Sequence, residues 1–330
     1  MRAMMNLTVV GVVCGLLAVT GTAACSSTVE CTVDRGSLTE AADACLRFGV
    51  STPNGPLSTT ETAAVTGSVG IAPSVLLSFH DFEAAPPLAE LDAVAAAGAI
   101  PVLTWEPWAH RGGDDYDRGA FPMGAIAAGV YDDYLYRWVD ELVAHGSTVY
   151  LRFAHEPNGT WYPWSPTGGT PPETYISAWR HVHDLFFSKG ATNVKWLWAP
   201  NVPVAGEADS LAAWFPGSEY VDVLGVDGYN WGTSVAGQGW VSPSALFASS
   251  FEQLRTVAPE IPVLVSEVGT AEQGGSKDAW ITELVAYLDD EPGVIGFVWF
   301  DHDKEADWRL TSSESASAAM GRALREAGLS

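Results

Sequence analysis

The sequence predicts a single (β/α)8 barrel, and three observations support this fold class. Eight short apolar runs alternate with amphipathic segments from about residue 46 onward. Several of these runs are apolar at nearly every position, which is typical of parallel strands buried beneath helices. The 330 residues also suit one such barrel, which takes about 250 residues, plus an N-terminal extension. A doubly wound open sheet is the alternative, but no glycine-rich dinucleotide-binding motif follows the first strand.

Each predicted strand is a short apolar run bounded by turn-forming residues. In chain order the predicted strands are Leu46–Ser51, Ser74–His80, Ile100–Trp105, Thr148–Glu156, Val194–Ala199, Val221–Val226, Pro262–Ser266 and Val294–Phe300. Residues 52–66, between the first two strands, are polar and rich in turn formers. This composition predicts a loop there.

The segments between the strands carry apolar residues at helical spacing. The predicted helices are Pro86–Ala97, Gly124–His145, Pro172–Lys189, Ser242–Val257, Lys277–Asp290 and Ser313–Ala327. Pro172 and Pro243 stand at typical helix starts. Gly146 and Gly190 stand at typical helix ends. After the fifth strand, Leu211–Phe215 predicts at most a short helix.

Residues 1–24 predict an export signal. Arg2 precedes the apolar run Leu7–Val19, which is too short to span a bilayer comfortably. Cleavage after Ala24 makes Cys25 the first mature residue, which resembles a bacterial lipoprotein signal, although Thr22 stands where such signals usually carry leucine. A plain secretory signal cut at the same place is the alternative. We therefore expect the protein on the extracellular side of a bacterial membrane, lipid-anchored or secreted.

The cysteines divide the rest of the chain into an arm and a domain. If Cys25 carries lipid, Cys31 and Cys45 can form a disulfide in an oxidising compartment. This bond ties an N-terminal arm, residues 25–45, to the first strand of a barrel domain that spans residues 46–330. No later apolar run is long enough to cross a membrane. The lipid is therefore the one membrane contact that the sequence predicts.

Charge and histidine placement exclude several classes of partner. The formal net charge of −24 argues against nucleic acid and anionic membrane surfaces as partners. Metal-dependent barrels of the amidohydrolase kind usually place two histidines at alternate positions of the first strand, and here that strand carries none. We therefore predict neither a metal nor another cofactor. The sequence gives no indication of the oligomeric state.

In a (β/α)8 barrel the chemistry takes place where the strands end. The residues at these predicted ends are His80, Asp81, Trp105, Glu106, His155, Glu156, Pro200, Asn201, Asp227, Tyr229, Glu267, Trp299 and Asp301. Carboxylates and aromatic rings dominate this set, and lysine and arginine are absent from it. Phosphate sites need glycine loops and cations, so this composition favours a sugar over a phosphorylated substrate.

Glu156 and Glu267 are the candidate catalytic pair. Glycoside hydrolysis uses two carboxyl groups on either side of the bond that is cut, about 5–5.5 Å apart in retaining enzymes. Each of these glutamates could instead be a solvated loop carboxylate. However, both end apolar strands, and both are followed by loop formers. Across a barrel mouth they can face each other.

Strand alternation adds a supporting residue. If Glu156 points into the barrel mouth, Arg152 points inward as well, at a deeper level. A buried guanidinium needs a carboxylate partner. We expect Glu267 or another acid to supply it.

The chain has 14 tryptophans, whose indole faces can stack on sugar rings. Six of them fall at predicted strand ends or in the loops that follow, namely Trp105, Trp108, Trp161, Trp164, Trp231 and Trp299. They predict a groove lined for a sugar polymer, with core packing as the alternative for any single residue. We expect Trp105 and His80, at their strand ends, to contact the substrate.

The motif from His155 to Trp164, His-Glu-Pro-Asn-Gly-Thr-Trp-Tyr-Pro-Trp, resembles glycoside hydrolase family 26. This family includes β-mannanases, mixed-linkage β-glucanases and β-1,3-xylanases. The resemblance covers roughly residues 46–312 and continues, in order, through Trp196–Asn201, Val221–Trp231, Leu264–Gly269 and Gly296–Asp301. It implies a retaining (β/α)8 hydrolase.

By this resemblance Glu156 matches the acid/base and Glu267 the nucleophile. Tyr229 matches a tyrosine that hydrogen-bonds the nucleophile. His155 and Asn158 match polar residues that position the sugar and the acid/base.

The aromatic residues of the motif carry a further implication. Trp161 and Trp299 match aromatic contacts around the subsite just before the cleaved bond. The run 161–164 is more similar to glucanase-type members than to mannanases. Pro157 departs from the family, since many members carry methionine there; the change affects the loop backbone and no catalytic group.

These observations together predict a secreted, lipid-anchored, retaining endo-β-glycanase. Its expected partner is a β-linked polysaccharide or oligosaccharide, β-mannan or mixed-linkage β-glucan. A non-catalytic carbohydrate-binding barrel is the alternative, and a metal-dependent hydrolase on the same fold is a third.

Overall fold

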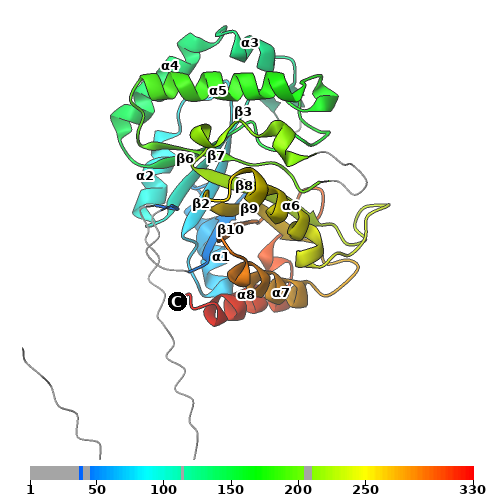
Figure 1. Ribbon diagram of the computed structural model, residues 1–330. Coiled ribbons are helices and arrows are strands. Elements are labelled where there is room, and N and C mark those ends of the chain that lie inside the picture. The colour runs from blue at the N-terminus through cyan, green and yellow to red at the C-terminus, as the bar shows by residue number, and fades with distance from the viewer. Residues whose placement is uncertain (1–36, 40–44, 113–114, 204–209) are drawn as a thin grey trace, which may run out of the picture.

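The computed structural model describes residues 37–39, 45–112, 115–203 and 210–330, which contain a closed barrel (Figure 1). Eight parallel strands pair in the order β1-β10-β9-β8-β7-β6-β3-β2, so the sheet has no free edge. These strands are β1 (Arg47–Ser51), β2 (Val75–Asp81), β3 (Ile100–Glu106), β6 (Val149–Phe153), β7 (Val194–Trp198), β8 (Val223–Asn230), β9 (Val263–Thr270) and β10 (Val294–Phe300). All eight predicted strands are present, and the predicted (β/α)8 barrel is confirmed.

Helices surround this barrel, with α4 and α5 on one side of Figure 1 and α7 and α8 on the other. The α-helices are α1 (Thr59–Val69), α2 (Leu88–Ala96), α3 (Met123–Ala127), α4 (Asp132–His145), α5 (Pro172–Ser188), α6 (Pro243–Val257), α7 (Lys277–Asp290) and α8 (Glu314–Glu326). Each predicted helix is present, but the segment 124–145 is divided into α3 and α4. Gly129, with a φ of 77°, lies in the break between them.

A segment predicted as a loop and an unpredicted hairpin also differ from the prediction. The segment predicted as a loop at 52–66 contains most of α1, whose Val65 and Val69 are buried. Threonine, glycine and serine dilute the apolar face of this helix, so its periodicity is weak in the sequence. A two-stranded hairpin, β4 (Ala109–Gly112) and β5 (Asp115–Asp117), was not predicted.

Short 3₁₀ helices occupy several connections. In the described residues, β7 is linked to β8 through η2 (Leu211–Trp214) and η3 (Ser218–Tyr220), which agrees with the short helix predicted there. The others are η1 (Pro166–Gly168) and η4 (Leu310–Ser312).

The core has one layer inside the barrel and a larger one between the sheet and the helices. Leu38, from the N-terminal arm, belongs to the inner layer and closes the end of the barrel where the strands begin. Its backbone N–H donates to the Tyr150 hydroxyl over 2.7 Å. The Arg47 guanidinium donates to the Ser37 carbonyl over 2.9 Å. Because this end is filled, the polar side chains near the barrel axis gather at the opposite end.

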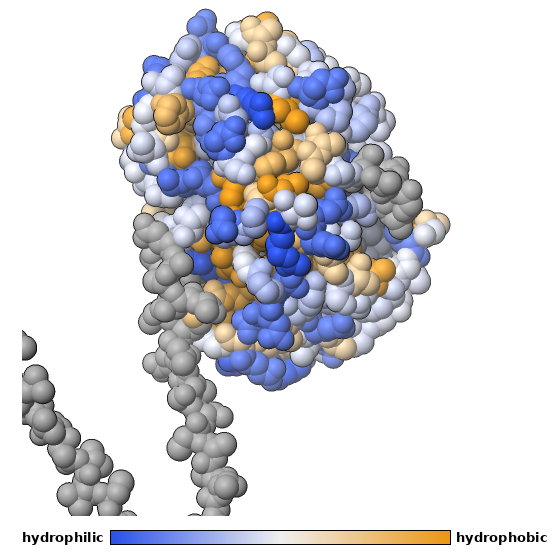
Figure 2. Space-filling model, in the orientation of Figure 1, coloured by the Kyte–Doolittle hydropathy of each residue, from blue (hydrophilic) through white to orange (hydrophobic). Residues whose placement is uncertain are grey.

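Some predictions fall on the N-terminal segment. Cys25 and Cys31 lie outside the described residues, as does the predicted export signal. Cys45 is described, and it is disulfide-bonded. None of the described helices is both long and apolar enough to cross a membrane. Figure 2 shows hydrophilic side chains over much of the visible face, with apolar residues in patches between them.

Candidate active site

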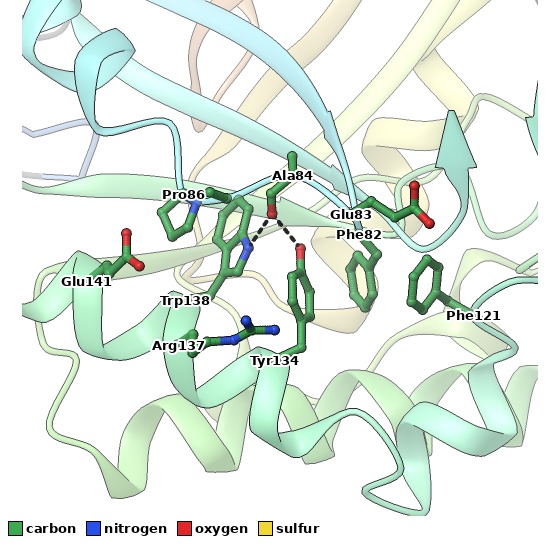
Figure 3. A pocket seen from close by; sticks show the side chains of 10 residues that line it. Phe82, Glu83, Ala84, Pro86, Phe121, Tyr134, Arg137, Trp138 and Glu141 are labelled. Carbon is green, nitrogen blue, oxygen red and sulfur yellow. Dashed lines mark hydrogen bonds between the residues drawn. The ribbon is translucent and has the colours of Figure 1, made fainter. Parts of the chain in front are cut away.

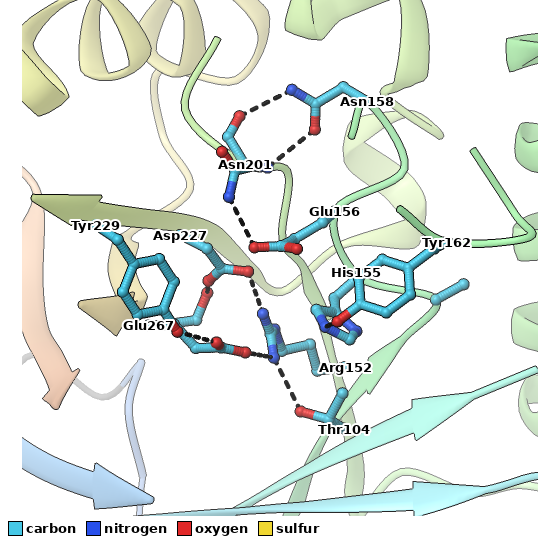
Figure 4. Close-up of polar contacts among 12 residues, drawn as sticks. Thr104, Arg152, His155, Glu156, Asn158, Tyr162, Asn201, Asp227, Tyr229 and Glu267 are labelled. Carbon is cyan, nitrogen blue, oxygen red and sulfur yellow. Dashed lines mark hydrogen bonds and ion pairs between the residues drawn. The ribbon is translucent and has the colours of Figure 1, made fainter. Parts of the chain in front are cut away.

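Arg152 lies at the centre of a polar cluster on the barrel axis (Figure 4). Its Nη1 donates to Glu267 Oε1 over 2.6 Å and to Thr104 Oγ1 over 3.0 Å. Its Nη2 donates to the carboxylate of Asp227. The guanidinium is completely buried. Arg152 therefore points inward, as strand alternation predicts, and it contacts Glu267 together with a second acid.

A bulge in β9 turns Glu267 toward the barrel axis. Val226 of β8 pairs with Val265, but the next residue, Asp227, pairs with Glu267, so β9 carries one extra residue. That residue, Ser266, donates to Asp227 Oδ1 over 2.6 Å, so it faces inward beside Glu267. Regular alternation would place neighbouring residues on opposite faces. The bulge is what brings both side chains to the interior.

The backbone that carries Glu156 is not a strand. β6 ends three residues earlier, so the predicted strand to Glu156 is wrong there. Ala154 and Glu156 have φ values of 44° and 51°, in the left-handed region that non-glycine residues rarely adopt. Three hydrogen bonds hold this backbone: Ala154 N–H to Trp105 O (3.0 Å), Glu156 N–H to Ala199 O (2.6 Å), and Tyr175 O–H to Ala154 O (3.1 Å). Contacts from β3, from Ala199 just after β7, and from α5 therefore impose the turn.

Both oxygens of the Glu156 carboxyl group accept hydrogen bonds. Asn201 Nδ2 donates to Oε1 over 2.7 Å, and Trp161 Nε1 donates to Oε2 over 2.6 Å. Asn158 bonds the backbone of Asn201 in both directions, at 2.8 and 2.9 Å. The Trp161 ring lies against Gly159, where an added Cβ would come within 2.7 Å of the indole. The motif residues thus orient this carboxyl group, and Asn158 does so through Asn201.

Burial and charge set the protonation of Glu156. Burial, and then the negative charge of Glu267, raise its pKa to about 7, although the bonds from Asn201 and Trp161 act in the opposite direction. A substantial fraction of Glu156 therefore carries a proton at neutral pH. This is the property that a general acid needs.

Glu267 is held as a hydrogen-bond acceptor on both oxygens. Arg152 donates to Oε1, and the Tyr229 hydroxyl donates to Oε2. Burial, and then the charge of Glu267, raise the pKa of Tyr229 well above its ordinary value, so the hydroxyl keeps its proton. Burial alone lowers the pKa of Arg152, but the carboxylates of Asp227 and Glu267 raise it above its ordinary value. Two fixed donors therefore orient Glu267.

His155 supports the wall of the site. Its Nε2 lies 2.9 Å from the Tyr162 hydroxyl, and its carbonyl accepts from Trp164 Nε1 over 2.6 Å. Burial, and then the charge of Arg152, hold the pKa of His155 well below its ordinary range, so the ring is neutral. The neutral ring binds the Tyr162 hydroxyl at the rim of the cluster.

Three predicted substrate contacts are wrong. Trp105 and Trp299 are completely buried in the layer between sheet and helices. Trp105 stacks on Trp138 at 4.3 Å, and Trp299 donates to the Trp308 carbonyl over 2.8 Å. His80 turns toward α2, where its Nε2 lies 3.2 Å from Glu90. Each of these residues stands at a strand position that faces outward.

The remaining tryptophans of the predicted groove differ in exposure. Trp164 is buried and stacks on Tyr162 at 4.4 Å, and Trp108, also buried, stacks on Tyr116 at 4.1 Å. Trp161 is 37% exposed beside Glu156. Trp231 is partly exposed. The structure therefore offers Trp161 and Trp231 to a ligand, rather than all six rings.

The cluster also contains residues to which no specific role was assigned from the sequence. Asn201 and Asp227 stand at predicted strand ends, so their position alone could have drawn attention to them. Glu106 also ends a strand, and its side chain is buried near Arg152 and Glu267. Tyr162 belongs to the quoted motif. Trp308 packs on Tyr229, with ring centroids 5.0 Å apart. It follows the last strand, and no pattern in the sequence predicted that it belongs to the site.

A separate pocket of about 380 Å³ lies outside the barrel, between the β2–α2 loop and α4 (Figure 3). Tyr134 and Trp138 both donate to the Ala84 carbonyl over 2.9 Å, which occupies their polar groups. Neither candidate catalytic glutamate lines this pocket. It is not part of the cluster around Arg152.

Known proteins share this arrangement of elements and motifs. The sequence model of Glycosyl hydrolase family 26 matches residues 129–270, which include both glutamates. Over 238 residues the chain is 38% identical to Endoglucanase H of Acetivibrio thermocellus, a match that covers 71% of this chain and 25% of that protein. The chain belongs to glycoside hydrolase family 26.

Other known proteins are also similar to this family 26 chain. It is 27% identical over 183 residues to Mannan endo-1,4-beta-mannosidase A and B of Caldalkalibacillus mannanilyticus, covering 52% of this chain and 32% of that protein. This family 26 chain thus spans 25% and 32% of the lengths of these two relatives. The catalytic domain of the Bacillus sp. JAMB-750 GH26 endo-beta-1,4-mannanase superposes with a TM-score of 0.66 at 18% identity, covering 89% of both chains. The GH26 domain of PbGH26-GH5A from Prevotella bryantii superposes with a TM-score of 0.63 at 16% identity, covering 84% of this chain and 88% of that one. These structures share the barrel fold.

Proposed function

We propose that this protein is a retaining endo-β-glycanase that hydrolyses a β-linked polysaccharide, either β-mannan or mixed-linkage β-glucan. One observation carries the proposal: two glutamates at the barrel mouth have different environments. The pKa of Glu156 is raised to about 7 by burial and by the charge of Glu267. Glu267 instead accepts hydrogen bonds from Arg152 and Tyr229. A proton donor and an oriented carboxylate are the two groups that double displacement requires.

In the first step, a Glu267 oxygen attacks the anomeric carbon and forms a bond to it. The bond from that carbon to the glycosidic oxygen breaks, and the Glu156 proton passes to this oxygen. Trp161 and Asn201 keep the Glu156 carboxyl group oriented during the transfer.

In the second step, ionised Glu156 removes a proton from water, whose oxygen attacks the anomeric carbon and releases Glu267. Coupling between the two glutamates favours this exchange of roles. Once Glu267 is an ester it has no negative charge, so one cause of the raised pKa of Glu156 is gone. Glu156 then ionises more readily, as a general base must.

The identity to relatives gives the order in which to test polymers. The chain is 38% identical to a protein named as an endoglucanase and 27% identical to one named as a mannosidase. Mixed-linkage β-glucan is therefore the first polymer to test, and β-mannan is the second.

The test compares the wild-type protein with Glu156→Ala and Glu267→Ala on both polymers, by release of reducing ends. We expect the wild type to hydrolyse one polymer, Glu267→Ala to be inactive, and Glu156→Ala to be slower by about 10²–10⁴-fold. NMR of the first product should show the β anomer, because two displacements retain configuration. Near wild-type rates in either variant would refute the assignment. Polymer binding without new reducing ends would instead favour the non-catalytic barrel.

We also propose that the protein acts outside the cell, anchored through a lipid on Cys25. The disulfide at Cys45 supports an oxidising compartment, and the leader sequence supports export. Labelling of cells with a radioactive fatty acid should mark the wild type but not Cys25→Ser. Equal labelling of both would contradict the lipid anchor.

A further inference from the structure

Strand alternation places Glu106 in the barrel mouth. In β3, Val102 belongs to the inner core, and Thr104, two residues on, binds Arg152 over 3.0 Å. Glu106 is the next residue on this inner face, whereas Trp105 faces outward. It therefore lies one level above the bond between Thr104 and Arg152, toward the open end of the barrel.

Glu106 is a buried carboxyl group with few partners. It is 8% exposed, and Trp108 Nε1 donates to its Oε2 over 3.3 Å. Within the described residues it takes part in no ion pair. Trp108 is fixed in turn by its stack on Tyr116 at 4.1 Å. A carboxyl group held at one oxygen has its other oxygen available for a ligand.

The titratable groups around Glu106 come from several elements. They are Glu267 on β9, Arg152 on β6, Lys304 after β10, Tyr162 in the β6–α5 loop, and Asp81, its partner on β2, whose carboxylate accepts the His110 N–H. Burial, and then the negative charge of Glu267, raise the pKa of Glu106 to about 8, against smaller opposite effects of Trp108, Arg152 and Lys304. At neutral pH it is therefore mostly a neutral acid, with one O–H to donate.

We propose that Glu106 is a substrate-binding residue that donates a hydrogen bond to a hydroxyl group of the sugar unit attacked by Glu267. This inference rests on the proposed glycanase function. Three observations carry it: the inward position of Glu106, its one hydrogen-bond partner among the described residues, Trp108, and its proximity to Glu267. A neutral carboxylic acid suits this place, because a second negative charge beside the nucleophile is unfavourable, whereas an O–H group binds a sugar hydroxyl.

The proposal predicts that two ionisations, rather than one, lower kcat/KM as the pH rises. Glu156 must be protonated to act as acid, and Glu106 must be protonated to donate to the sugar. Burial and the charge of Glu267 raise their pKa values to about 7 and about 8, respectively. Because kcat/KM reports on the free enzyme, log(kcat/KM) should fall more steeply than a slope of −1 above about pH 8, until the roughly 10- to 100-fold contribution of the Glu106 hydrogen bond is lost.

The test uses the full-length protein, its Glu106→Gln and Glu106→Ala variants, and Glu141→Gln as a control on the exposed face of α4. One soluble β-glucan oligosaccharide serves as substrate from pH 5 to 10. At pH 6 we expect Glu106→Ala to lower kcat/KM by about 10- to 100-fold, since it loses one hydrogen bond to the substrate. Glutamine keeps a donor, so Glu106→Gln should stay within about 5-fold of the wild type, and its alkaline limb should be no steeper than a slope of about −1. Glu141→Gln should match the wild type in both respects.

Two results would overturn the proposal: wild-type kcat/KM in folded Glu106→Ala, or an alkaline limb in the wild type that is no steeper than that of Glu106→Gln. If circular dichroism shows that the alanine variant is unfolded, the slope of the glutamine variant decides. Activity retained by Glu156→Ala or Glu267→Ala would refute the glycanase mechanism instead. A wild type that hydrolyses no β-glycan would overturn both proposals.

Discussion

Arg152 and Glu267 meet across the barrel, with Nη1 of the guanidinium 2.6 Å from Oε1 of the carboxylate. They belong to β6 and β9, which are not neighbours in the sheet. The other arm of the guanidinium binds Asp227, so one cation joins two buried acids. Because a guanidinium is planar and rigid, it fixes the position of both carboxylates.

Loss of this cation should be costly. In Arg152→Met, the acids Asp227 and Glu267 stay buried without compensation, and we expect the free energy of unfolding to fall by about 3–5 kcal/mol. Hydrolysis should be lost as well, because Glu267 loses one of its two donors. Urea denaturation at pH 7 measures the first effect. The control is Arg255→Met, which breaks an exposed pair with Glu291 and should cost about 0–1 kcal/mol. Equal losses in the two variants would contradict the central role of Arg152.

The indole of Trp161 should lower the pKa of Glu156. Its hydrogen bond lowers the pKa of Glu156, so Trp161→Phe should raise that pKa and move the alkaline limb of the kcat profile to higher pH. The exposed ring also offers a stacking surface, so KM should rise by about 3- to 10-fold. Trp280→Phe is the control, because the Nε1 of this buried residue of α7 donates over 2.7 Å to the Val241 carbonyl and bonds neither glutamate. An alkaline limb that stays in place in Trp161→Phe would show that the bond is absent in solution.

The sequence predicted the barrel because buried parallel strands are recognisable from composition. It could not predict how β6 ends. Ala154 and Glu156 take left-handed backbone conformations that their own side chains do not favour. Carbonyl groups of β3 and of Ala199, just after β7, and a hydroxyl group of α5 stabilise them. Such contacts arise only once the barrel has formed.

Side-chain direction explains the three wrong substrate contacts. A strand end offers two successive residues, and only one faces the axis. In β3 the inward residue is Glu106 and not Trp105, and in β10 Trp299 turns outward to the Trp308 carbonyl. Trp105 and Trp299 were predicted as substrate contacts because they are aromatic, although both face outward. Counting alternate positions in β3 from Val102, an inner-core residue, finds Glu106 instead.

Strand alternation alone does not predict the direction of the Glu267 side chain. Leu264 faces the inner core, so a regular strand would turn Glu267 outward. The bulge at Ser266 reverses this direction. A bulge depends on the pairing of two strands, so the sequence of one strand does not show it.

The raised pKa values also predict how stability depends on pH. Glu106 and Glu156 have pKa values of about 8 and about 7 in the folded protein and an ordinary value of 4.5. Between pH 4.5 and 8 the folded state therefore binds more protons than the unfolded state, and stability falls as pH rises. We expect the free energy of unfolding to fall by a few kcal/mol, roughly, from pH 5 to pH 8. Urea denaturation at four pH values measures it. Glu106→Gln should show a shallower fall, and an unchanged pH dependence would contradict the raised pKa of Glu106.

Tyr175 should connect the strained backbone to catalysis. Its buried hydroxyl donates to the Ala154 carbonyl over 3.1 Å. Glu156 follows two residues later, in the same left-handed segment of backbone. In Tyr175→Phe that carbonyl loses its tyrosine donor, which should cost about 1–2 kcal/mol of stability. The left-handed turn should then relax, and kcat should fall by roughly 10-fold as the acid is misplaced.

Tyr150→Phe is the matched control for this effect. Tyr150 is equally buried, and its hydroxyl accepts from the Leu38 N–H over 2.7 Å at the closed end of the barrel. Its loss should lower stability by a similar amount, about 1–2 kcal/mol, but leave kcat unchanged, because no atom of the turn depends on it. Thermal unfolding and initial rates separate the two quantities. If both variants lose kcat in proportion to stability, the loss is general, and the hydrogen bond to Ala154 has no special role in placing Glu156.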